Sequence, residues 1–118
     1  MLRAGAGDVV HPGDQLQLTY SSEERGFIAV LSRAGAGAAS VYFPAGARAA
    51  WPAPPGRDQR LPASTVLDRA LGRETIYALH CAEPIAIEPV RRRLAAGAAA
   101  FPPSCTVEEI PLDKREPD

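Results

Sequence analysis

Apolar and polar residues alternate at every position from Gln15 to Tyr20, which places Leu16, Leu18 and Tyr20 on one face. A period of two residues is typical of a half-buried β-strand. From Phe27 to Leu31 every residue is apolar, a pattern typical of a strand that is covered on both faces. With three further runs rich in β-branched and aromatic residues, the pattern predicts five strands, near residues 15–20, 27–32, 40–43, 75–81 and 106–110.

One segment has the spacing of a helix. Pro89 suits a first helical turn, because its missing N–H would have no partner there. Val90 and Leu94 follow at a spacing of four residues. Pro102 and Pro103 then prevent the helix from continuing. We therefore expect one helix, near residues 89–99.

Turn-forming residues separate these elements. The Gly/Ala run at 33–38 predicts a hairpin between the second and third strands, and the segment 71–74, Leu-Gly-Arg-Glu, resembles a turn. Residues 44–58 are rich in proline and are expected to form a loop without regular structure. The predicted core consists of apolar residues of the strands and the helix: Leu16, Leu18, Ile28, Val30, Val41, Phe43, Ile76, Leu79 and Leu94.

The order of these elements predicts a mainly β fold. Short strands separated by turns favour an antiparallel β-sandwich or a partly open barrel, here with one α-helix in the C-terminal half. The length of 118 residues fits one domain. We expect a flexible N-terminal segment at 1–12, the domain at 13–112 and a charged, frayed tail at 113–118.

Composition narrows the classes of partner. The formal net charge of −1 lacks the basic excess that is typical of nucleic-acid-binding domains, so we expect no nucleic acid. No apolar run approaches the roughly 20 residues that cross a bilayer, so we expect no direct membrane insertion by this segment. The first residues also lack the apolar stretch of a secretory signal. The net charge neither suggests nor excludes a protein partner. A protein of unknown identity is the expected partner if the chain is a binding module.

The sequence lacks a recognisable catalytic or metal-binding pattern. Its two histidines are His11 and His80, and His80 and Cys81 are neighbours on a predicted strand. Such neighbours point to opposite faces and do not readily share a metal ion. We expect no catalytic residue, no metal and no cofactor. A small enzyme that uses Cys105 or a carboxylate is the least favoured alternative.

Trp51 is the residue most suited to contact a partner, because it lies in the proline-rich segment. An exposed loop tryptophan can anchor a protein interface, or it can fold back over the edge of a sheet. We predict a binding surface that comprises Trp51, Tyr42 and Arg57. The basic run 91–93 spreads around the helix and indicates a solvated face more than a site for an acidic partner or lipid headgroups.

Cys81 and Cys105 are predicted to form a disulfide. Cys81 ends a predicted strand and Cys105 begins the last one, and a helical excursion of this length can bring its two ends together. The alternative is two separate buried thiols. Because structural disulfides are rare in the cytosol, the bridge favours an extracytoplasmic, periplasmic domain of a membrane-anchored protein, with a cytoplasmic location as the alternative.

Several segments of the chain also resemble one known protein family. Residues 13–18, 26–31 and 40–44 are similar to the first three strands of an uncharacterised bacterial β-sandwich domain family, and residues 61–62 and 71–79 to its later landmarks. That domain accompanies caspase-like peptidases, kinases and membrane-anchored regulators such as anti-sigma factors. The resemblance implies a non-catalytic binding or sensory accessory module, and the Ala/Arg/Pro-rich composition fits a myxobacterial member. A purely structural domain of a larger protein is the alternative.

Overall fold

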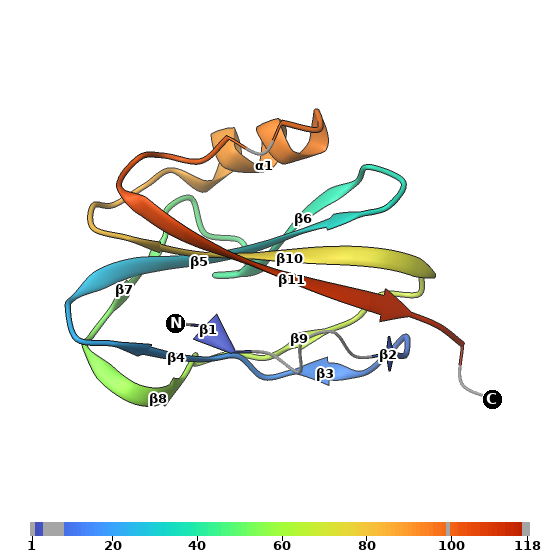
Figure 1. The fold of residues 1–118 in the computed structure, drawn as a ribbon, viewed down its shortest axis with the longest axis horizontal. Coiled ribbons are helices and arrows are strands. Elements are labelled where there is room, and N and C mark those ends of the chain that lie inside the picture. The colour runs from blue at the N-terminus through green and yellow to red at the C-terminus, as the bar shows by residue number, and fades with distance from the viewer. Residues whose placement is uncertain (1, 4–8, 99, 117–118) are drawn as a thin grey trace.

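Three long strands, β5, β10 and β11, form the centre of the computed structural model, which describes residues 2–3, 9–98 and 100–116 (Figure 1). The described residues are mainly β with one helix, as the sequence predicts. The elements are, in chain order, β1 (Leu2–Arg3), β2 (Val9–Val10), β3 (Gln15–Leu16), β4 (Thr19–Ser22), β5 (Gly26–Ala34), β6 (Ala39–Phe43), β7 (Trp51–Ala53), β8 (Gly56–Arg60), β9 (Thr65–Val66), β10 (Gly72–Cys81), α1 (Ile87–Ala95) and β11 (Cys105–Lys114).

The main sheet has six strands, in the order β2-β11-β10-β5-β6, with β7 also paired to β5. The predicted hairpin of the second and third strands is confirmed as β5 and β6. Every strand pairing among the described residues is antiparallel except that of β2, which runs parallel to the last two residues of β11.

The main sheet is covered differently on its two faces. The helix α1 lies over one face, and two smaller sheets, β1-β4-β8 and β3-β9, lie below the other (Figure 1). One core lies between the main sheet and the smaller sheets and includes Ile28, Ile76 and Leu18. The second core lies under the helix and includes Leu31 and Leu79. Because alternate residues of β5 enter different cores, its apolar residues are buried on both faces, as the sequence predicts.

The helix begins earlier and ends earlier than the sequence predicts. Ile87 is its first residue, so Pro89 occupies the first turn, where its missing N–H costs nothing. Gly97 adopts a left-handed conformation, with φ of 83°. Its N–H donates to the carbonyl of Leu94 (3.0 Å), and the next N–H donates to that of Arg93 (2.8 Å). This pair of hydrogen bonds ends the helix, so 96–98 are not helical, and residue 99 lies outside the described residues.

The prediction that residues 44–58 carry no regular structure is wrong, because β7 and the first part of β8 lie within them. The predicted strand at 15–20 is divided into β3 and β4, which belong to different sheets. Val41 is half-buried rather than a core residue, whereas the other predicted core residues are buried. At the termini, β2 lies within the segment predicted to be flexible, and β11 continues into the predicted tail as far as Lys114.

Candidate functional site

The paired strands β10 and β11 run the length of the main sheet and are linked by a different kind of interaction at each end. At one end Cys81 faces Cys105, and at the other Gly72 faces Lys114. We call the first the disulfide end. The second is the ionic end, where Lys114 meets the carboxylates of Glu74 and Asp68.

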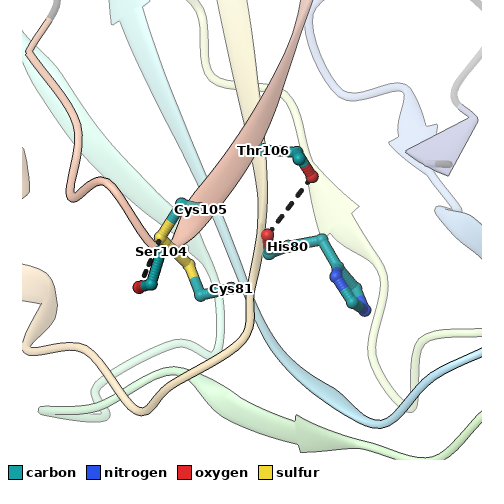
Figure 2. Close-up of a disulfide and its surroundings, with 5 residues drawn as sticks. All are labelled: His80, Cys81, Ser104, Cys105 and Thr106. Carbon is teal, nitrogen blue, oxygen red and sulfur yellow. Dashed lines mark hydrogen bonds between the residues drawn. A yellow bond between two sulfur atoms is a disulfide. The ribbon is translucent and has the colours of Figure 1, made fainter.

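Cys81 and Cys105 form a disulfide, which confirms the predicted pairing (Figure 2). The two residues are direct cross-strand partners, so the helix between them connects neighbouring strands. Beyond the bridge, the N–H of Ala82 donates to the carbonyl of Ser104 (2.9 Å). On the sheet side of the bridge, the Thr106 hydroxyl donates to the carbonyl of His80 (3.3 Å). The ends of the two strands are therefore held by a covalent bond and by hydrogen bonds on either side of it.

The register of the sheet places the disulfide in the same row as the proline-rich segment. Cys105, Cys81, Phe27 and Pro52 occupy one row across β11, β10, β5 and β7. A groove of about 460 Å³ lies at this end of the sheet. Its lining residues come from the start of β5, from β7 and from the turn after β10: Arg25, Gly26, Phe27, Pro52, Ala53, Pro54 and Ala82. We call it the disulfide-end groove.

Gly26 lies directly over the ring of His80. A β-carbon at Gly26 would stand 2.4 Å from His80 Cε1 and 2.6 Å from Nε2, so no larger residue fits there without moving the ring. Burial lowers the pKa of His80, and the opposing charge of Glu24 does not offset this. His80 is therefore neutral at pH 7. Among the described residues its buried Nε2 has no hydrogen-bond partner.

Aromatic side chains on the core side support the proline-rich wall of the groove. The Trp51 ring meets Tyr20 and Phe43 edge to face, with centroids 6.2 and 5.5 Å apart. The Tyr20 hydroxyl donates to the carbonyl of Pro54 (2.8 Å), and burial raises the pKa of Tyr20. Trp51 is thus half-buried and supports the groove wall from the core side.

The three residues predicted to bind a partner lie on three different strands. Trp51 is on β7, Tyr42 on β6 and Arg57 on β8. Tyr42 is half-buried, and its carbonyl accepts a hydrogen bond from the Thr65 hydroxyl (3.2 Å), whereas Arg57 is exposed. No ring contact or hydrogen bond joins these three among the described residues. Their role in binding stays a prediction.

At the ionic end, Lys114 is buried, with an exposed fraction of 2%. Its ammonium donates to Glu74 Oε1 (2.9 Å) and to Asp68 Oδ1. Burial acts to lower the pKa of Lys114, but the hydrogen bonds and charges of the two carboxylates outweigh it and raise the pKa. The hydrogen bond from Lys114 lowers the pKa of Asp68. Lys114 and Asp68 are therefore both charged at pH 7. Glu74 is only 5% exposed, and Lys114 is its ion-pair partner.

A second groove, of about 570 Å³, lies at the ionic end. Its walls are the turn that follows β2, the segment from β9 to β10, and the residues after β11: Pro12, Gly13, Val66, Leu67, Arg69, Leu71 and Glu116. The first two walls are tied by backbone hydrogen bonds of 2.9 Å, from Gly13 to Leu67 and from Leu67 to Asp14. We call it the ionic-end groove.

Sequence reasoning missed most of this arrangement. The sequence predicts that Lys114 lies in a frayed tail, although Ile110, Leu112 and Lys114 continue one alternating face of the last strand. That alternation was the available signal for a buried lysine. Pro52 and Phe27 become neighbours only through the pairing of β7 with β5. No local pattern in the sequence predicts that pairing.

Other classes of site are not found in the described part of the chain. No group of three or more metal-ligating side chains gathers there. No helix there is long and apolar enough to cross a membrane. Comparisons with protein-family models, curated proteins and solved structures found no match.

Proposed function

We propose that this protein is a non-catalytic accessory module that binds a protein partner in the disulfide-end groove. One observation carries the proposal. The proline-rich segment forms a wall of a groove that faces Phe27 and stands beside the disulfide. The side chains of Phe27, Pro52 and Pro54 give the groove apolar walls, and Arg25 is the charged side chain that lines it.

Such a groove suits an extended segment of a protein. Proline and backbone held in a sheet lose little conformational freedom on binding, which favours affinity. Apolar side chains of the partner would enter between Phe27 and the prolines, and a carboxylate next to them would pair with Arg25. A surface with an apolar centre and a charged rim is typical of protein interfaces.

The rest of the structure supports the same proposal. The main and smaller sheets would together act as a sandwich-like frame that holds the groove in one shape. The disulfide supports an extracytoplasmic, periplasmic location, since structural disulfides persist in oxidising compartments. The sequence resemblance to an accessory domain of membrane-anchored regulators points the same way.

The test uses a peptide library displayed on phage and panned against the immobilised, oxidised protein. We expect enriched peptides that pair apolar residues with an acidic residue, and isothermal titration calorimetry gives their affinity. Arg25→Glu should weaken binding at least tenfold, which corresponds to about 1.4 kcal/mol.

Arg57→Glu is the matched control, because it makes the same charge change at an exposed arginine outside the groove. Equal loss with both variants would mean that only net charge matters. Loss with Arg57→Glu alone would transfer the site to the surface predicted from the sequence. If no peptide is enriched on the folded protein, the binding proposal fails and the purely structural alternative is favoured.

A further inference from the structure

The ionic end exposes apolar side chains in a way that the rest of the described chain does not. Three large hydrophobic residues are exposed among the described residues: Val9 (50%), Val66 (59%) and Leu71 (53%). Val66 and Leu71 line the ionic-end groove, and Val9 lies on the edge strand β2, which leads into Pro12 of the same groove. Exposed apolar residues gathered at one place mark an interaction surface more often than residues scattered singly.

Most charges at this end are already engaged within the molecule. Asp68 binds Lys114, the Arg115 guanidinium pairs with Asp113 (2.6 Å), and the Asp14 carboxylate accepts from the N–H of His11 (2.9 Å). Arg69 and Glu116 both line the groove and are exposed. Within the described residues neither has an ion-pair partner. The groove therefore offers one unpaired cation, one unpaired anion and an apolar wall.

We propose that the ionic-end groove is the contact through which two copies of this chain form a symmetric dimer. In a two-fold dimer the same patch meets itself, so each residue of one copy faces a different residue of the other, and the reverse contact occurs as well. A cation and an anion on one groove satisfy this condition. Arg69 of each copy can pair with Glu116 of the other, while the exposed Leu71 of each enters the opposite groove.

The ionic cluster shapes this surface before any partner arrives. Asp68 stands between Leu67 and Arg69, and its carboxylate accepts from the Lys114 ammonium and from the N–H of Ala70 (3.1 Å). The wall that carries Val66 and Leu71 is thus attached to the main sheet. A preformed surface loses less conformational entropy on association.

Sedimentation equilibrium of the oxidised chain, from micromolar to near-millimolar protein, tests the dimer. We expect a monomer–dimer equilibrium with a dissociation constant in the micromolar range, because the contact is small. Arg69→Glu and Glu116→Arg should each raise the dissociation constant at least about tenfold, since each brings like charges together. The double variant Arg69→Glu/Glu116→Arg should restore dimerisation, because it exchanges the two charges.

Two controls separate the dimer from the proposed partner site. Leu71→Ser should weaken the dimer and leave peptide binding at the disulfide-end groove unchanged. Arg25→Glu should do the reverse. A wild-type chain that stays monomeric at the highest concentration would overturn the proposal. So would single charge reversals that leave the dissociation constant unchanged, or a double variant that fails to restore the dimer while its circular dichroism spectrum matches the wild type.

Discussion

The two ends of the β10–β11 pair show two ways of joining the same two strands. At the disulfide end a covalent bond joins direct cross-strand partners. At the ionic end one buried ammonium joins the carboxylates of Glu74 and Asp68. A disulfide acts largely by restricting the unfolded chain. The ionic cluster acts in the folded state and depends on every member remaining charged.

Because the two ends differ in this way, different conditions should affect the two grooves. A reductant acts on the disulfide end and leaves the charges of the ionic end alone. Strong acid acts on the ionic cluster and leaves the disulfide intact. The two grooves therefore depend on independent supports, so a change that weakens one end should leave the other unaffected.

The largest effect is expected when the buried cation is removed. Lys114→Met leaves the Glu74 carboxylate buried without a counter-charge, which should lower the free energy of unfolding by about 3–5 kcal/mol. Urea denaturation at pH 7 measures it. The double variant Lys114→Met/Glu74→Leu should recover most of the loss, because no unpaired charge is left. A loss below about 1 kcal/mol in the single variant would show that the cluster contributes little.

Removal of the disulfide should come next. The bridge closes a sequence separation of 24 residues, and the chain-entropy relation gives about 3.5 kcal/mol for a loop of this size. The variant Cys81→Ala/Cys105→Ala should lose about that amount in urea denaturation. Combined with Lys114→Met, the two losses should add to within about 0.5 kcal/mol, since the sites are far apart. A large coupling energy would contradict the independence of the ends.

A smaller effect is expected at Gly26. Gly26→Ala places a β-carbon against the His80 ring and should cost about 1–3 kcal/mol, the usual range for overpacking. His80→Ala in the same chain should remove most of that cost, because it removes the ring that the new methyl group meets. Thermal unfolding followed by circular dichroism reports both variants. Equal costs with and without the His80 ring would mean that the contact is not the cause.

The pH dependence of stability near neutrality should report His80. Because burial lowers the pKa of His80 in the folded state, protonation favours the unfolded chain. The free energy of unfolding should thus fall as the pH drops below about 6.5, the unfolded value, until the lowered folded pKa is passed. In His80→Gln this slope should disappear. A slope that persists in the variant would assign the dependence to another group.

The smallest effect is expected from Asp68, whose side chain is exposed. Lys114 lowers its pKa, so its contribution is present above about pH 3.9 and is lost as the pH falls through the folded value. The difference in unfolding free energy between wild type and Asp68→Asn should be below about 1 kcal/mol at pH 7. It should vanish in acid. A difference that is constant from neutral to acidic pH would exclude the ion pair as its source.

The sequence predicted the central strands and the disulfide better than the two grooves. The all-apolar run from Phe27 to Leu31 has one interpretation, because a strand with no polar face must be covered on both sides. The disulfide followed from two cysteines that flank one excursion. Both inferences use information that is local in the chain or that involves a single pair.

The grooves depend on pairings that local patterns do not encode. Pro52 lies on a strand because β5 supplies a partner, whereas proline-rich sequence alone indicates a loop. The sequence of residues 71–74 predicts a turn, yet Glu74 lies on β10 and is buried, paired with Lys114 of the neighbouring strand. Only the register of β10 against β11 makes that ion pair visible, and the register emerges from the whole sheet.

The separation of the two ends is tested most directly by amide proton–nitrogen correlation spectra recorded along a dilution series of the oxidised wild-type chain. We predict concentration-dependent shifts at Gly13, Val66 and Leu71 of the ionic-end groove. The signals of Gly26 and Ala53 at the disulfide-end groove should not move. Shifts at the disulfide-end groove, or no shift at either end up to near-millimolar protein, would contradict the assignment of self-association to one end and partner binding to the other.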